Sequence, residues 1–196
     1  ISNPGCYPTS IQLPLIPILK KNLINSKNIT IDSKSGYSGA GKNFQNKFKH
    51  KHIFESIQAY GIVKHKHMSE LDQEFSKHIH KKINYTFNPH LLPTFRGILS
   101  SIYIEVKPKV TAEKLTKELK KFYLKNKFIK IKKVNEPIGT SNVINTNNCE
   151  ISVCKTRDRS QLVIFSALDN LIKGASGQAV QNMNLVQGFK ENLGLK

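Results

Sequence analysis

The stretch that decides the fold is CEISVCKTRDRSQLVIFS, residues 149–166. Residues 149–155 and 161–166 are rich in strand-forming side chains, and only the polar residues 156–160 lie between them. A parallel pairing needs a crossover of about a dozen residues or more, so these two strands have room only for an antiparallel pairing. The pair therefore predicts a sheet that is not built from strictly alternating strands and helices.

Outside this stretch, the chain mixes helices and strands and shows no internal repeat. Further strands are predicted at 28–34, 83–87, 97–107 and 128–133, and helices at 9–22, 69–82, 111–126 and 170–189. Loops are predicted at the glycine-rich residues 35–42 and the polar residues 135–148. The helix at 9–22 is expected to be interrupted by Pro14 and Pro17. Two helices carry apolar stripes, made of Leu71, Phe75 and Ile79, and of Ala112, Leu115, Leu119 and Phe122.

This order of elements predicts an α+β domain with a mixed, largely antiparallel sheet. A chain of 196 residues suits one domain, or one domain with an appendage. No G-x-G-x-x-G lies between a strand and a helix, so we expect no Rossmann domain within this chain.

The formal charge of +18 raises the question of a nucleic-acid partner. Only Arg96, Arg157 and Arg159 are arginine among 31 basic residues, and the lysines are spread through every segment. A base-reading protein more often shows clustered arginine and stacking aromatics. We therefore expect no specific nucleic-acid partner, although the positive field favours an anionic substrate. No stretch is apolar enough to predict a membrane span.

The three cysteines are too few for a disulfide framework in a chain of this length. A reducing compartment, the cytoplasm, is the simplest inference. Cys149 and Cys154 lie in predicted strands without nucleophile context, so we interpret both as buried strand residues.

Cys6 is the best candidate nucleophile. Residues 3–9, NPGCYPT, place it in a tight turn just before a helix, with Pro8 suited to the first helical turn. The free N–H groups and the positive end of the helix dipole favour a thiolate there. An ordinary buried cysteine is the alternative from these residues alone.

The NPGCYPT motif resembles the active-site signature of the N-acetyl-γ-glutamyl-phosphate reductases, relatives of aspartate-semialdehyde dehydrogenase. Other segments resemble motifs of the same family, in the same order. They are SGYSGAGK (35–42), HKH followed by Glu70 (65–70), FNPHLLP with Arg96-Gly97 (87–97), NNCEI (147–151), SALDNLIKGA (166–175) and GQAVQNMN (177–184). The resemblance spans the whole chain. Lys66 and Lys42 stand where the family more often has arginine, and Ser69 where it usually has proline, which puts any bidentate role at position 66 in doubt.

The resemblance implies that Cys6 attacks the acyl phosphate of N-acetyl-L-glutamyl 5-phosphate, and that NADPH reduces the resulting thioester to the semialdehyde, a step of arginine biosynthesis. It also implies a sheet with helices on one face, of the semialdehyde dehydrogenase dimerisation-domain type. Residues 1–168 would form the catalytic and dimerisation domain, and 169–196 a helix that packs on an NADP-binding Rossmann domain outside this chain. A homo-oligomer, dimer or tetramer, is the expected assembly.

His65 and His67 are the candidates for the acid/base group, since histidine has a suitable pKa and both lie on one face of an extended segment. The relatives favour His67 slightly. A metal site is not expected from the pairs His50/His52, His65/His67 and His78/His80, because lysines lie within two of them. We expect His78 and His80 to be surface residues.

The resemblance implies roles for the 38–41 loop and for the terminal helix, and the scarcity of arginine in this chain indicates one for Arg96. Ser38, Gly39 and Gly41 are expected to contact NADP, with a plain turn as the alternative. Arg96 is a candidate for a substrate carboxylate or phosphate, with a structural ion pair equally open. Asn182 is expected to reach the nicotinamide end of the cofactor. Gln178 shares its helix face and has a polar interdomain surface as a rival interpretation.

The chain begins with Ile1 and the cysteine motif follows at once, so we expect an upstream domain that is needed for productive NADPH binding. Two alternatives remain from the sequence. One is a related phosphorylating semialdehyde dehydrogenase with another acyl substrate. The other is an inactive basic binding fragment.

Overall fold

A computed structural model describes residues 1–41, 52, 54–79, 83–158 and 160–196. Its centre is one mixed sheet with the order β2-β3-β1-β4-β7-β6-β5 among the described residues. The strands are β1 (Ile29–Gly36), β2 (Gln58–Ala59), β3 (Tyr85–Leu92), β4 (Ile98–Glu105), β5 (Ile129–Ile131), β6 (Cys149–Lys155) and β7 (Gln161–Leu168).

The β6–β7 pair is antiparallel, with Cys149 opposite Leu168, as residues 149–166 predict. β1 lies between a parallel neighbour, β3, and an antiparallel one, β4. β5 and β6 form the second parallel pair. The predicted α+β class with a mixed, largely antiparallel sheet is therefore confirmed.

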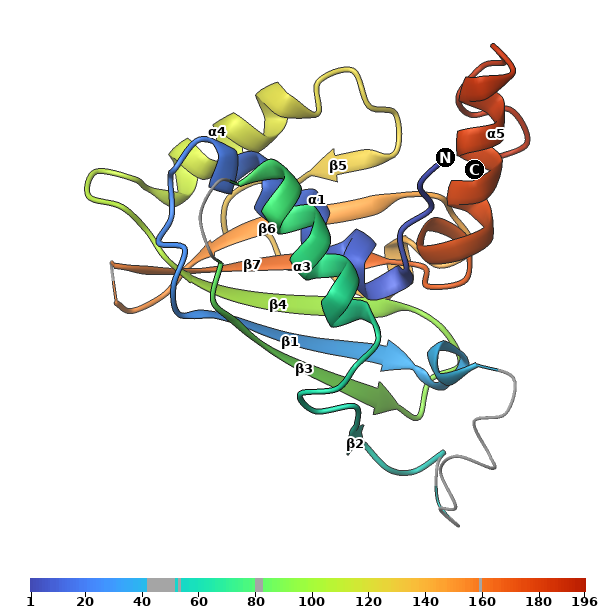
Figure 1. The fold of residues 1–196 in the computed structure, drawn as a ribbon, viewed down its shortest axis with the longest axis horizontal. Coiled ribbons are helices and arrows are strands. Elements are labelled where there is room, and N and C mark those ends of the chain that lie inside the picture. Colours follow the sequence, from blue (N-terminus) through green and yellow to red (C-terminus); the bar gives the residue numbers. More distant parts are fainter. Residues whose placement is uncertain (42–51, 53, 80–82, 159) are drawn as a thin grey trace.

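The helices α1 (Cys6–Lys20), α3 (His67–His78) and α4 (Ala112–Phe122) cover one face of the sheet (Figure 1). The short helices are 3₁₀ segments at Tyr37–Ala40 and Thr140–Asn142 and a π-helix at Ile172–Ser176. The π-helix leads into α5 (Gly177–Val186), which lies at one end of the sheet beside both chain ends (Figure 1).

The core forms where α1 lies on the middle strands. Ile11 and Leu15 of α1 are fully buried, as are Ile31, Ile102 and Ile164 of the sheet. Removing such side chains from water is the main stabilising contribution to this layer, about 1.5–3 kcal/mol for each. The sequence predicts that Pro14 and Pro17 interrupt this helix, but both lie inside a continuous α1. Burial on this scale outweighs the free-energy cost of the two prolines.

Several predicted boundaries are wrong. β3 continues past Phe87 to Leu92, through most of the FNPHLLP segment (87–93), because β1 pairs with it along its whole length. The predicted terminal helix begins as a π-helix. Phe122, predicted in the buried stripe of α4, is 49% exposed, whereas the other members of that stripe are buried. The end of the predicted helix at 69–82 lies partly outside the described residues.

Candidate functional site

Cys6 is the first residue of α1, and Gly5 is the N-cap. The predicted position at a helix N-terminus is thus confirmed, and the backbone N–H groups there lower the pKa of the thiol as expected, but burial has the larger effect. Burial raises the pKa of the Cys6 thiol to about 11, and the backbone N–H groups of Tyr7 and Cys6 oppose this only in part. The resting group is therefore a thiol that needs a base.

The imidazole of His67 supplies a base at this place. A Cβ added to Gly5 would lie 2.5 Å from His67 Nε2, so only glycine allows the ring to pack on the turn that carries the thiol. Burial, with His65 and Lys66 nearby, lowers the pKa of His67 to about 4. The ring is therefore neutral near pH 7, and its buried Nδ1 has no hydrogen-bond partner among the described residues.

His65 lies beside His67, with the ring centroids 4.8 Å apart. Its Nδ1 accepts the backbone N–H of His67 at 3.2 Å, which leaves the ring proton on Nε2. Tyr7, Tyr60 and Phe87 make edge contacts with the His65 ring. These contacts hold the His65 ring in place, and its backbone contact in turn orients His67.

Two tyrosines that the sequence analysis did not single out connect this cluster to the sheet. The Tyr60 hydroxyl donates to the Tyr7 hydroxyl at 3.1 Å, which donates to the carbonyl of His90 at 3.2 Å. Burial raises the pKa of Tyr60 to about 12, and that of Tyr7 further still. Both hydroxyls therefore stay protonated across the physiological range.

A pocket of about 520 Å³ collects most of the predicted site residues. Cys6, His65, His67, Ser38, Gly39 and Gly41 all line it. Among the described residues that line it, the charged ones are Lys64 and Lys66, so this part of the pocket suits an anion. Lys42, the last residue of the predicted loop, lies outside the described residues.

Gly174 and Asn170 also line this pocket, and neither is among the site residues expected from the sequence. A Cβ on Gly174 would lie 2.6 Å from Cys6 Cβ, so the π-helix packs directly on the nucleophile. The Asn170 side chain donates to Ser38 Oγ at 3.0 Å and accepts the Gly97 N–H at 2.7 Å. It thereby joins the predicted cofactor loop to the sheet. Both residues belong to the motif at 166–175, which was the available signal.

Arg96 lies outside this set of lining residues. Its guanidinium donates to the buried carboxylate of Asp169 at 3.2 Å and to the side chain of Asn145. The structural ion pair, one of the two interpretations, is thus present. A substrate role for Arg96 stays a prediction.

Asn182 also lies away from the pocket, in α5. Its side chain donates to the carbonyl of Ser2 at 2.9 Å and to Asn3 Oδ1 at 3.2 Å, next to the turn before Cys6. Gln178 donates to Thr9 Oγ1 at 3.0 Å and to the carbonyl of Lys173. Contacts of these residues with a cofactor stay predictions.

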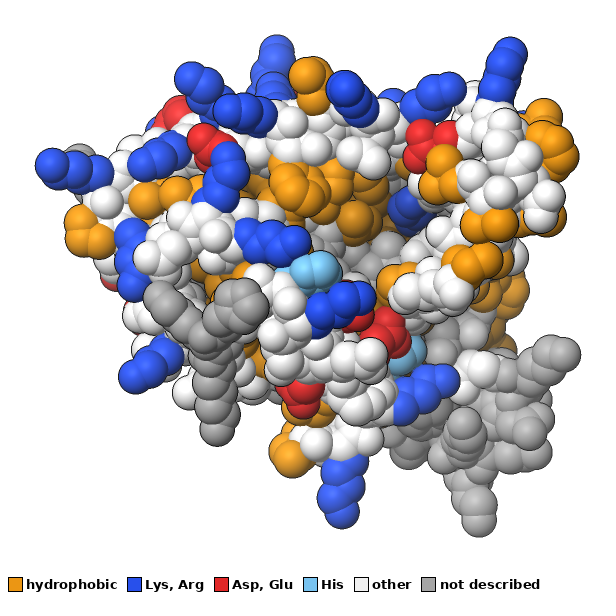
Figure 2. Space-filling view, turned by 45° about the horizontal axis from the view of Figure 1, so that its top comes forward, with side chains coloured by type: hydrophobic (Ala, Val, Ile, Leu, Met, Phe, Trp, Pro, Cys, Tyr) orange, Lys and Arg blue, Asp and Glu red, His pale blue; other side chains and the backbone are white. Residues whose placement is uncertain are grey.

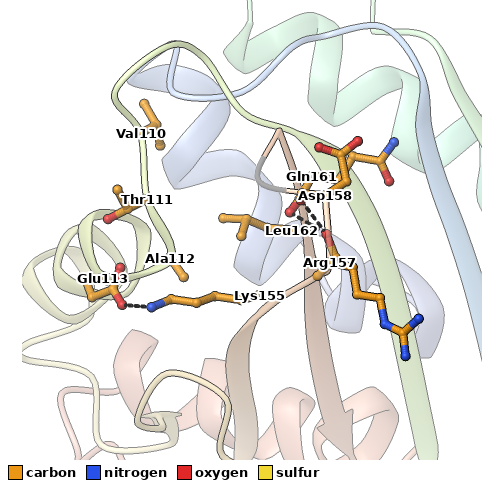
Figure 3. Close-up of a pocket in the computed structure, with 10 residues that line it drawn as sticks. Val110, Thr111, Ala112, Glu113, Lys155, Arg157, Asp158, Gln161 and Leu162 are labelled. Atoms are coloured by element: carbon orange, nitrogen blue, oxygen red, sulfur yellow. Dashed lines mark hydrogen bonds and ion pairs between the residues drawn. The ribbon is translucent and has the colours of Figure 1, made fainter.

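A second pocket, of about 460 Å³, lies at the N-terminus of α4 (Figure 3). Glu113 and Lys155 face each other in an ion pair at 2.5 Å, and the side chain of Arg157 points away from them (Figure 3). Its described lining residues include no cysteine or histidine. We assign it no chemistry.

Within the described ranges, no group of three or more histidine, cysteine or acidic side chains is arranged to hold a metal ion. His78 is partly exposed and pairs with Glu74 at 3.3 Å, whereas His50 and His80 lie outside those ranges. All three cysteines are free thiols. Cys149 is buried as predicted, whereas the prediction that Cys154 is buried is wrong, since that residue is partly exposed. Lysine and arginine side chains are spread over the face in Figure 2 and do not gather in one patch. None of the described helices is long and apolar enough to cross a membrane.

Comparison with protein families gives a match over residues 6–170 to the model described as semialdehyde dehydrogenase, dimerisation domain. Among curated proteins, the chain is 45% identical to a probable chloroplastic N-acetyl-gamma-glutamyl-phosphate reductase of Arabidopsis thaliana, over 100% of this chain and 49% of that protein. It is 47% identical to an N-acetyl-gamma-glutamyl-phosphate reductase of Afipia carboxidovorans, over 100% of this chain and 55% of that protein. The chain thus spans about half the length of these relatives.

The fold is similar to a crystal structure of aspartate semialdehyde dehydrogenase II from Vibrio cholerae. The TM-score is 0.72 at 18% identity, over 97% of this chain and 63% of that one. An aspartate semialdehyde dehydrogenase from Francisella tularensis gives a TM-score of 0.71 at 13% identity, over 94% of this chain and 64% of that one. At these identities the likeness shows the fold alone.

Proposed function

Because the chain belongs to the semialdehyde dehydrogenase dimerisation-domain family, we propose that it is the catalytic and subunit-pairing half of an N-acetyl-γ-glutamyl-phosphate reductase. The reaction is the reduction of N-acetyl-L-glutamyl 5-phosphate to N-acetyl-L-glutamate 5-semialdehyde and phosphate, a step of arginine biosynthesis. The observation that carries this proposal is the packing of the His67 ring on Gly5, beside the Cys6 thiol, in a pocket whose charges are positive.

Cys6 is the proposed nucleophile. His67 takes the thiol proton, Cys6 Sγ bonds to the acyl carbon, and the bond from that carbon to the phosphate oxygen breaks. The positive pocket favours the dianionic acyl phosphate over a neutral ester. NADPH, when bound, supplies hydride to the thioester carbon. His67 then protonates the oxygen formed and removes that proton again as the C–S bond breaks, releasing the aldehyde.

His67, in preference to His65, is proposed as the acid/base group. Its Nε2 faces the turn that carries the thiol, and its pKa of about 4 leaves it unprotonated and ready to accept a proton. His65 has its Nδ1 engaged with a backbone N–H, which suits an orienting role. The fall in His67 basicity is the cost of burial, and substrate charge in the pocket would raise it again.

The Ser38–Gly41 segment is proposed to contact NADP. It forms one wall of the pocket, and apart from the neighbours of Gly41 in the chain, no atom of the described residues lies within 4 Å of the place a Cβ would take on Gly41. The Asn170 bond to Ser38 keeps this wall in place. Asn182 of α5, which donates hydrogen bonds to Ser2 and Asn3, is proposed to contact the nicotinamide end of the cofactor.

Residues 169–196 are proposed to contact an NADP-binding domain. Five large apolar side chains of α5 and the segment after it are each more than half exposed: Met183, Leu185, Val186, Phe189 and Leu193. Such a patch is typical of a surface that is covered by another domain. The description of the family as a dimerisation domain supports a homo-oligomer. The free thiols agree with a reducing compartment, which we propose is the cytoplasm.

The test is phosphate-dependent reduction of NADP by N-acetylglutamate semialdehyde, measured on the full-length protein. We expect turnover that requires both the semialdehyde and phosphate, since the thioester must be cleaved by phosphate in this direction. Turnover with aspartate semialdehyde but not with the acetylated compound would instead indicate the related dehydrogenase. No turnover with either substrate, in a folded protein that retains NADP, would overturn the proposal.

A further inference from the structure

The N-terminus of α1 is capped from another helix. The backbone N–H of Gly5, the N-cap residue, donates to Glu70 at 3.0 Å for Oε1 and 3.3 Å for Oε2. In a capping box this bond comes from a glutamate at the third position of the same helix. In α1 that position is Pro8, and the first turn contains no acidic residue. The carboxylate is supplied by α3 instead.

Glu70 lies in the first turn of α3, the helix that begins at His67. The first turns of α1 and α3 lie side by side (Figure 1), so one carboxylate joins the turn before Cys6 to the turn that carries the imidazole. The same Gly5 receives the His67 ring on its Cα. Two independent contacts therefore converge on one glycine, from two residues of one helical turn.

The charge of Glu70 does not help to ionise the thiol. A carboxylate at this distance raises the pKa of Cys6, and burial raises the pKa of Glu70 itself. The first effect disfavours the Cys6 thiolate and the second is a cost of burying the carboxylate, so Glu70 is retained at this place at an electrostatic cost. What it contributes is the fixed bond to Gly5.

We propose that Glu70 is a positioning residue: by capping the Cys6 helix from the His67 helix, it holds the imidazole of His67 against the turn that carries the nucleophile. This inference rests on the proposed function of Cys6 and His67. It assigns Glu70 no contact with the substrate and no proton transfer.

Two variants of the full-length protein separate the position of the acceptor oxygen at residue 70 from its charge. Glu70→Gln keeps an oxygen acceptor at the same distance and loses the charge, whereas Glu70→Asp keeps the charge and withdraws the oxygens by one methylene. We expect Glu70→Asp to lower kcat by about 10-fold or more, with KM for the semialdehyde little changed, because a small displacement of a catalytic group is costly. We expect kcat of Glu70→Gln to stay within about 3-fold of the parent value, because the bond to Gly5 is kept and the catalytic group is not displaced. Glu74→Asp is the matched control, since Glu74 lies one turn further along α3 and pairs with His78.

The opposite ranking, with Glu70→Gln impaired and Glu70→Asp active, would assign the carboxylate to charge-dependent chemistry and overturn the proposal. Equal activity of both variants and the parent would also overturn it. A second readout does not depend on turnover: the NMR titration of the His67 ring in labelled protein. The pKa of His67 should rise toward the ordinary histidine value in Glu70→Asp and stay unchanged in Glu70→Gln. An inactive parent with this titration pattern would reject the proposed function and retain the positioning role.

Discussion

Cys6 and Cys149 are two thiols of one chain with the same acidity and different surroundings, Cys6 being partly exposed and Cys149 buried. Burial raises the pKa of each to about 11. Cys6 begins a helix, lines a pocket and has an imidazole packed on the preceding residue. Cys149 begins a strand, is fully buried and has the hydroxyl of Ser166 at 3.4 Å. Thiol acidity therefore does not distinguish the two, whereas access and a neighbouring base do.

The largest expected effect is on kcat, when each of the two cysteines is replaced in turn. Cys6→Ser should lower kcat of the full-length protein by at least about 10³-fold, since removing a nucleophile removes the whole covalent route. Cys149→Ala should leave kcat within a few-fold and lower the free energy of unfolding by about 1 kcal/mol, because it leaves a small cavity. Steady-state kinetics and urea unfolding measure the two quantities. Comparable activity losses in the two variants would remove the distinction.

The next effect separates the two histidines beside Cys6. His67→Asn should lower kcat by about 10²-fold or more, the usual contribution of a positioned acid/base group. His65→Asn should cost less, because the asparagine oxygen can still accept the His67 N–H that His65 Nδ1 accepts in the structure. Single-turnover rates of thioester reduction compare the variants directly. A larger loss in His65→Asn would transfer the acid/base role to His65.

Alkylation of the native chain tests acidity and access separately. With a pKa of about 11, Cys6 should react with iodoacetamide at pH 8 about 10²-fold more slowly than a free cysteine, because only the thiolate reacts. Cys149, with the same pKa and no exposure, should stay unlabelled until the chain unfolds. Mass spectrometry of the peptides follows both sites in one sample. Native labelling of Cys149 as fast as that of Cys6 would contradict the description of its surroundings.

The smallest effect is a pH dependence of stability due to His67. Its pKa is lowered from 6.5 to about 4, so between these values the unfolded state binds more protons than the native state. This contribution to stability is present above pH 6.5 and is lost as the pH falls toward 4. The urea midpoint should therefore fall less steeply over this window in His67→Gln than in the parent. Parallel curves for the two proteins would show that the ring is not desolvated.

The fold class could be predicted from the sequence because short connections, such as residues 156–160, exclude parallel pairing. The predicted residues that line the pocket could be found because they lie in motifs with a cysteine, two histidines or a glycine-rich loop. β3 could not be delimited, since Pro89 and His90 are poor strand formers that are held in the sheet by β1 along its full length. The capping role of Glu70 and the packing of Gly174 on Cys6 could not be predicted either. Both depend on which helix ends meet in space, and no local spacing encodes that.

The glycines at 5 and 174 enclose Cys6 from two sides. Where a side chain would begin, Gly5 has the His67 ring at 2.5 Å and Gly174 has the Cys6 Cβ at 2.6 Å. Neither backbone is in the left-handed region, so the demand for glycine is one of space alone. The packing around the nucleophile thus leaves no space for a side chain at either glycine. Even alanine at either position would have to displace the reacting groups, so substitutions that leave the geometry of this thiol unchanged must lie further out.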